Sequence, residues 1–150
     1  MFSDDVPLKK RAAPYLAGLM FALSIWTFVD GIMYNNRLDG QPSISFFYWT
    51  PTIVNFIFFF LTLFIDFSKV KNDVSDPDAK IARVGLFIVF ILAASSFFLA
   101  CWVLFEVFLS KEAVEKGIDV WPGTALLISQ IFMYLSALLL VISRPDDNSF

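Results

Sequence analysis

The amino-acid sequence predicts an all-α, polytopic membrane protein with four transmembrane helices in two antiparallel hairpins. Apolar residues make up 58% of the 150 residues, whereas soluble domains average about 45–50% even when Gly is counted. Four apolar segments, each long enough to cross a bilayer, are nearly free of charge. We expect spans at about residues 15–33, 49–65, 82–108 and 122–142, which together form a single domain over residues 1–150.

The first expected span, 15–33, contains the most unusual residue of the chain. Ala12 to Val29 carry no charge, and this run of 18 residues is long enough to span. Asp30 then interrupts the run before its apolar character ends. An ionisable group inside a spanning helix costs about 2.5–3.5 kcal/mol on insertion scales. We therefore expect Asp30 to face a neighbouring helix, a polar cavity or a partner rather than lipid.

The second expected span, 49–65, is rich in Phe and apolar on all sides, as contact with lipid permits. Pro51 lies near its start, where the missing N–H does no harm. Asn55 is the amide within this span.

A charged linker of residues 66–83 leads to the third expected span, 82–108. Its Ser-Asp-Pro-Asp sequence at residues 75–78 is a weak signal of a helix start, with Asp76 or Ser75 as the cap and Pro77 in the first turn. In the middle of the span, Ser96 and Ala100 have the small-xxx-small spacing that lets membrane helices approach closely. Glu106 lies near the end of the span.

The fourth expected span, 122–142, follows a Trp-Pro-Gly sequence at residues 121–123 and contains Gln130. Gln130 and Asn55 are able to hydrogen-bond between helices, at about 0.6 kcal/mol each on average. We interpret both as contacts that hold helices together.

The basic residues predict the orientation. With four spans, both termini and the linker 66–83 share one side, which collects eight Lys and Arg residues against three on the other side. The positive-inside rule therefore places the termini in the cytosol. The opposite, lumenal side is expected to carry an interfacial aromatic belt, formed by Tyr34, Tyr48, Trp49 and Trp121.

Asp30 and Glu106 fall in the same leaflet in this topology. Two carboxylates that share a poorly hydrated site repel each other, which raises at least one pKa and is the physical basis of a proton-coupled site. The alternative interpretation is that both carboxylates reach the interface and are hydrated, or that Arg37 neutralises Asp30.

Signatures of an enzyme are absent from the sequence. With no His and a single Cys, Cys101, the chain lacks a Cys–His or Ser–His nucleophile. It has no cluster of metal-ligating residues and no Gly-rich phosphate loop, so we expect no metal and no cofactor. No Lys/Arg cluster is large enough to indicate a nucleic-acid partner. Membrane lipids and other membrane proteins are the expected partners.

Several short motifs occur in a characteristic order. They are Trp26-Thr27-Phe28-Val29-Asp30, Cys101-Trp102-Val103-Leu104-Phe105 and Val120-Trp121-Pro122-Gly123. In these motifs and in its four-span order, nearly the whole chain resembles the transmembrane protein 50 (small membrane protein 1) family. The first span and the following Trp49-Thr50-Pro51 are most similar to the fungal branch, that of vacuolar protein sorting-associated protein 68.

The resemblance implies a non-catalytic subunit of a complex in the endosomal or vacuolar membrane, which serves late endosome-to-vacuole protein sorting. It also implies a partner, a small four-span protein related to the leptin-receptor overlapping-transcript product (vacuolar protein sorting protein 55 in fungi). The residues leave two other functions open. One is a small proton-coupled transporter or channel using Asp30 and Glu106, and the other is a lipid-binding scaffold.

Overall fold

The computed structural model describes residues 8–71 and 75–144, and within these residues it contains helices and no strand. Four helices are long and apolar enough to cross a membrane. They are α1 (Leu8–Arg37), α2 (Phe46–Phe64), α3 (Pro77–Val103) and α5 (Trp121–Ser143). A π-helical turn, η2 (Leu104–Phe108), extends α3, while η1 (Lys69–Lys71) and α4 (Lys111–Glu115) are short helices in the connections. The predicted all-α class with four membrane-length helices is confirmed.

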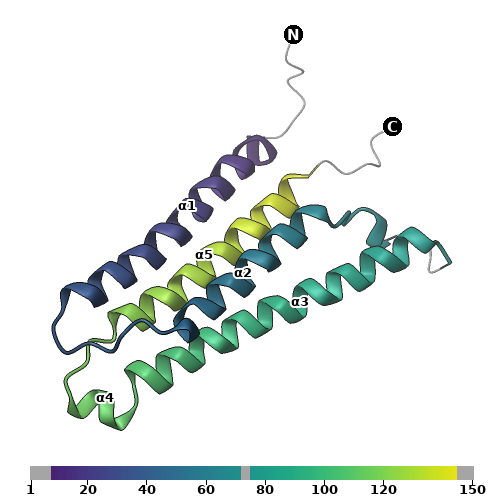
Figure 1. Cartoon of the computed structure of the whole chain (residues 1–150). Coiled ribbons are helices and arrows are strands. Elements are labelled where there is room, and N and C mark those ends of the chain that lie inside the picture. The colour runs from purple at the N-terminus through teal and green to yellow at the C-terminus, as the bar shows by residue number, and fades with distance from the viewer. Residues whose placement is uncertain (1–7, 72–74, 145–150) are drawn as a thin grey trace.

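The bundle has two ends (Figure 1). The end that carries the start of α1, the end of α5 and the connection 65–76 is called the terminal end below. The opposite end, with the connections 38–45 and 109–120, is called the loop end. The start of α3 is capped as its sequence predicts, since the Asp76 carboxylate accepts a hydrogen bond from the Asp78 amide and Pro77 occupies the first turn.

Helix α5 is the common neighbour of the other three long helices. Helix α1 lies along α5 and forms the most extensive helix pair of the molecule, whereas α2 lies along α3 (Figure 1). The predicted arrangement in two hairpins is not confirmed, because the backbone of α1 approaches α5 rather than α2. Side chains still connect α1 and α2, as the ring centroids of Phe21 and Phe59 are 4.9 Å apart.

Helix α1 is longer than the predicted span at both ends and contains Pro14. The helix ends shortly before Gly40, whose φ of +81° turns the chain toward α2.

Two apolar clusters form the core. The cluster nearer the loop end centres on Phe28, Tyr48, Ala100, Val103, Phe108 and Leu126. The other centres on Phe58, Phe59, Val89, Met133 and Ala137. Between them, α2 and α5 place the polar residues Thr52, Asn55, Ser129 and Gln130, all buried. The core of the bundle is therefore two apolar layers with a polar layer between them.

Candidate functional site

Asp30 has its hydrogen-bond partner within the chain. Trp121 Nε1, at the start of α5, donates to Asp30 Oδ2 at 3.0 Å. One turn further along α1, the Tyr34 hydroxyl donates to Asp119 Oδ2 at 3.0 Å. The structure therefore places Asp30 against a neighbouring helix, one of the three environments expected for it. The Asp30 side chain is also exposed at the loop end of the bundle.

Glu106 does not share a site with Asp30. It lies exposed on η2, and the backbone of α1 approaches neither α3 nor η2. Across residues 8–71 and 75–144, no ion pair joins Asp30 to Arg37. The expectation of two neighbouring carboxylates therefore differs from the structure, because α5 separates the two helices that carry them.

The four aromatic residues of the expected belt all lie at the loop end, but in two environments. Tyr34, Trp49 and Trp121 are partly exposed, with 37–43% of their surface accessible. Tyr48 is buried, and its hydroxyl donates to the Pro122 carbonyl oxygen at 2.7 Å. The structure thus places Tyr48 in the core, because its hydroxyl satisfies a carbonyl in the first turn of α5.

Small residues form a closely packed seam between α1 and α5. Ser24 Oγ donates to the Ser129 carbonyl oxygen at 2.7 Å, and Ser136 Oγ donates to the Ala17 carbonyl oxygen at 2.8 Å. At Gly31 a Cβ atom would lie 2.9 Å from both Ala125 Cβ and Tyr48 Oη, so only Gly fits there. Sequence reasoning missed this seam. Its signal was the seven-residue spacing of Ala17, Ser24 and Gly31, matched by Ser129 and Ser136.

The predicted packing residues Ser96 and Ala100 are completely buried on α3. Ser96 Oγ shares a short hydrogen bond with the Tyr134 hydroxyl of α5, and that hydroxyl also reaches the Ala93 carbonyl oxygen at 2.9 Å. Ser96 therefore faces the phenol of Tyr134, whereas Ala100 lies in the core cluster nearer the loop end.

The predicted amide residues Asn55 and Gln130 line one internal cavity of 30 Å³, together with Thr52, Ser24 and Ser129. Three side-chain oxygens are buried there with no hydrogen-bond partner among the described residues: Thr52 Oγ1, Asn55 Oδ1 and Gln130 Oε1. An unpaired buried acceptor costs about 1–3 kcal/mol. The cavity has the volume and the polar partners that one ordered water requires.

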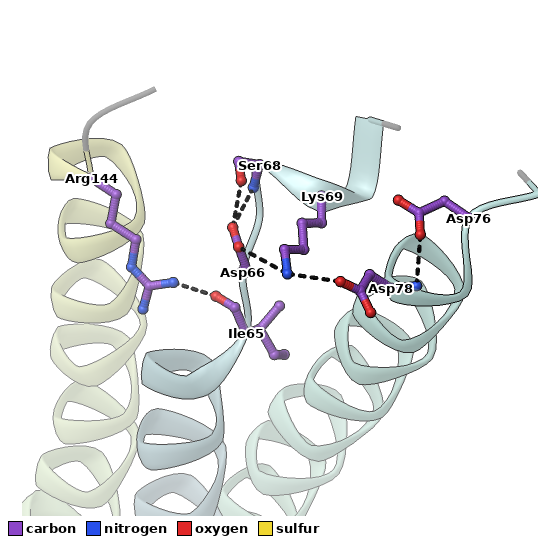
Figure 2. A network of polar contacts seen from close by, with 7 residues as sticks. All are labelled: Ile65, Asp66, Ser68, Lys69, Asp76, Asp78 and Arg144. Carbon is purple, nitrogen blue, oxygen red and sulfur yellow. Dashed lines mark hydrogen bonds and ion pairs between the residues drawn. The ribbon is translucent and has the colours of Figure 1, made fainter. Parts of the chain in front are cut away.

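At the terminal end, Arg144 caps the last turn of α2 (Figure 2). Its guanidinium donates to the carbonyl oxygens of Ile65, Thr62 (3.0 Å) and Leu63 (2.8 Å), and its Cζ lies 5.5 Å from the centre of the Phe67 ring. The last carbonyls of a helix have no partner within it and carry the negative end of the helix dipole. Arg144 therefore fixes the end of α5 to the end of α2.

The face of α1 opposite its seam with α5 carries small residues that the described part of the chain leaves exposed. A Cβ atom built on Gly18 would meet nothing within 4 Å, and Ala22 one turn later is exposed. Trp26, 73% exposed, continues the same line at four-residue spacing. Asp30 ends the line at the edge of this face, beside Trp121 of α5. We refer to Gly18, Ala22, Trp26 and Asp30 as the α1 outer stripe.

Groups of three or more side chains able to hold a metal ion do not occur within residues 8–71 and 75–144. The notable features are instead contacts between helices and exposed membrane-facing surfaces. Four membrane-length apolar helices around a shared core define a small multi-pass membrane protein.

Comparison with known proteins identifies its family. The model of the uncharacterised protein family UPF0220 matches residues 4–150, so the chain belongs to that family. It is 31% identical over 145 residues to a transmembrane protein 50 homolog of Dictyostelium discoideum, covering 90% of this chain and 92% of that protein. It is 33% identical over 144 residues to the UPF0220 protein C8D2.02c of Schizosaccharomyces pombe, covering 91% and 82%. No solved structure gives a significant match.

These relatives confirm the resemblance to the transmembrane protein 50 family. A particular closeness to the fungal vacuolar protein sorting-associated protein 68 stays a prediction.

Proposed function

We propose that this protein is a non-catalytic membrane subunit that binds a second small four-span membrane protein through the α1 outer stripe. The observation that carries the proposal is the open surface at Gly18 and Ala22, on a helix whose one close backbone neighbour among the described residues is α5. Small residues let a second transmembrane helix approach closely, so that packing and hydrogen bonds drive association within lipid.

The α1 outer stripe also offers an aromatic and a polar contact to a partner. The Trp26 indole borders the small residues, and the exposed carboxylate of Asp30 is available to a further hydrogen-bond donor beside Trp121. Ionisable groups within membrane spans pair with polar neighbours rather than face lipid. A helix with a donor side chain near its lumenal end fits this surface.

The proposed setting is the endosomal or vacuolar membrane, in late endosome-to-vacuole protein sorting. It is supported by the family resemblance, which also supports a protein related to the leptin-receptor overlapping-transcript product as the partner. The proposed orientation places the terminal end in the cytosol and the loop end in the lumen. The eight Lys and Arg residues on the terminal side, against three on the other, support it.

A proton-coupled transporter is the weaker proposal. It needs Asp30 and Glu106 to act on one ion path, and their helices do not pack against each other within one copy. Proton flux in proteoliposomes that depends on both carboxylates would revive it.

The test is co-purification of the tagged protein from native membranes in a mild detergent, with Gly18→Leu, Ala22→Leu and Asp30→Leu as variants. We expect near-equal recovery of the four-span partner with the wild type and a several-fold loss with each variant. Ser95→Leu is the matched control, since Ser95 is a small exposed residue on α3. Equal partner recovery from all four variants would contradict the proposal, provided that circular dichroism shows each variant to be folded.

A further inference from the structure

A groove opens between the end of α2 and the start of α3, at the terminal end of the bundle. Its volume is 330 Å³, within the range of small-molecule sites. Most of its wall is apolar, formed by Leu61, Phe64, Ile65, Ile81, Ile88 and Val89.

The groove exists because α3 turns small residues toward α2. Ala82 and Gly85 line it, and a Cβ atom at Gly85 would already lie 3.2 Å from Ile65 Cγ1. Larger side chains at these two positions would fill the space between the helices.

Charged groups line the groove only at its mouth. The Lys69 ammonium lies 3.0 Å from Asp78 Oδ2 and 4.0 Å from Asp66 Oδ2, so it is held between two carboxylates (Figure 2). The hydrogen bond to Asp78 raises the pKa of Lys69, and the hydrogen bond from the Ser68 hydroxyl lowers the pKa of Asp66. With two carboxylates and one ammonium, the mouth carries one more formal negative than positive charge.

We propose that this groove binds one glycerophospholipid with a zwitterionic headgroup, its acyl chain along the apolar wall and its headgroup at the Asp66–Lys69–Asp78 mouth. The position fits, because the mouth lies where the helices end and the apolar wall continues toward the middle of the spans. This inference concerns α2 and α3 and does not rest on the proposed function of α1.

The charges at the mouth select the headgroup. An ammonium or choline group pairs with the excess carboxylate, while the lipid phosphate accepts hydrogen bonds from Lys69. An anionic headgroup adds a phosphate without a cation to balance the carboxylates, and like charges at this distance repel. We therefore expect phosphatidylcholine to bind more tightly than phosphatidylglycerol.

The experiment uses the full chain in phosphatidylcholine vesicles that contain a trace of phosphatidylcholine with a photoactivatable acyl chain. After irradiation, mass spectrometry maps the labelled peptides. We expect the segments 61–65 and 81–89 to be labelled several-fold more than lipid-facing segments of α5. Photoactivatable phosphatidylglycerol should label them several-fold less.

Two variants fill the groove from opposite walls, Ile81→Trp on α3 and Leu61→Trp on α2. Both positions are partly exposed, at 72% and 37%, so the larger side chain is accommodated without disturbing the core. Each variant should abolish the excess labelling, whereas Ile91→Trp, an exposed position outside the groove, should preserve it. The double variant Asp66→Asn/Asp78→Asn should shift the preference toward phosphatidylglycerol.

Labelling spread evenly over all four helices would overturn the proposal, as would excess labelling that survives both groove-filling variants. Excess labelling by both lipids alike, unchanged in the Asp66→Asn/Asp78→Asn variant, would overturn the headgroup assignment.

Discussion

The α1–α5 and α2–α3 pairs are made of similar apolar segments but pack differently. The first, called the sealed pair below, is closely packed, whereas the second, called the open pair, leaves a groove at one end. Helices α1 and α5 meet through small residues, with two serine hydrogen bonds that lie two helical turns apart along the seam. Helices α2 and α3 share a groove of 330 Å³ at the terminal end. Both pairs contain a Gly at the contact, Gly31 in the first and Gly85 in the second.

The two glycines differ in what they face, although the helices of both pairs are similarly apolar. Gly31 faces atoms that cannot move away, because Ala125 Cβ belongs to the neighbouring helix and the Tyr48 hydroxyl is tied to Pro122. Gly85 faces the flexible end of Ile65. The first pair leaves one face of α1 exposed, where we propose a protein partner, and the second leaves the groove where we propose a lipid.

Substituting the glycines gives the largest expected contrast. Gly31→Ala should destabilise the fold by about 1–3 kcal/mol, because overpacking a tight contact has a cost of this size. Gly85→Ala should change stability little, since the Ile65 side chain can shift. Gly18→Ala should stabilise by about 0.5–1 kcal/mol, because Ala favours the helix and meets nothing there. Equilibrium unfolding in mixed micelles, followed by circular dichroism, measures all three. Equal effects at Gly31 and Gly85 would contradict the distinction between the pairs.

Removing the Arg144 cap should have the next largest effect. Arg144→Ala leaves three carbonyl oxygens near the end of α2 without their donor, at an expected cost of about 1–2 kcal/mol. Arg144→Lys should recover only part of this, because a lysine keeps the charge but lacks the planar fork. Hydrogen exchange should accelerate near residues 65–70 while the α1–α5 seam stays protected. Uniform acceleration through all four helices would show that the two ends are not independent.

Removing one serine hydrogen bond between α1 and α5 is a smaller perturbation of the sealed pair. Ser24→Ala should cost about 0.6 kcal/mol, the average for hydrogen bonds between membrane helices. Ser136→Ala should cost a similar amount, and the double variant should be nearly additive because the two sites lie far apart along the seam. Thr50→Ala is the control, since its hydroxyl bonds only within its own helix, and it should be nearly neutral. The same unfolding assay checks these values.

The smallest expected effect is the response of the open pair to pH. The pKa of Asp66 is lowered in the folded protein, so its contribution is present above the unfolded value of about 3.9 and is lost as pH falls toward the folded pKa. The pKa of Lys69 is raised, so its contribution is present below about 10.4 and is lost as pH rises further. Protection of the connection 65–71 should therefore be constant between about pH 5 and 9. A midpoint near neutral pH would contradict this.

Much of this architecture could be predicted from the sequence, because uncharged length and apolar composition alone indicate a membrane span. The cap at Asp76 and the burial of Ser96 and Ala100 follow from local patterns that each helix carries by itself. The choice of helix neighbours could not be predicted in this way. Pairing α1 with α5 depends on the fit of two small-residue faces distant in sequence, and only that pairing gives Asp30 the Trp121 indole as its partner.

The expectations for Glu106 and Tyr48 differ from the structure for the same reason, because the sequence does not give the rotation and lateral position of each helix. Asp30 and Glu106 share a leaflet in the predicted topology, but lateral position around the bundle decides whether two side chains meet. Tyr48 matches an interfacial aromatic by its position in the chain, yet the helix rotation turns it into the core toward Pro122.

The most direct test of the central claim, that α1 has a free face for a partner protein, is photo-crosslinking in native membranes from a photoreactive residue at Ala22. The same residue at Ser95 on α3 serves as the matched control. The account predicts a discrete adduct with one small polytopic protein from position 22 and only lipid adducts from position 95. Lipid adducts alone at both positions would contradict the claim.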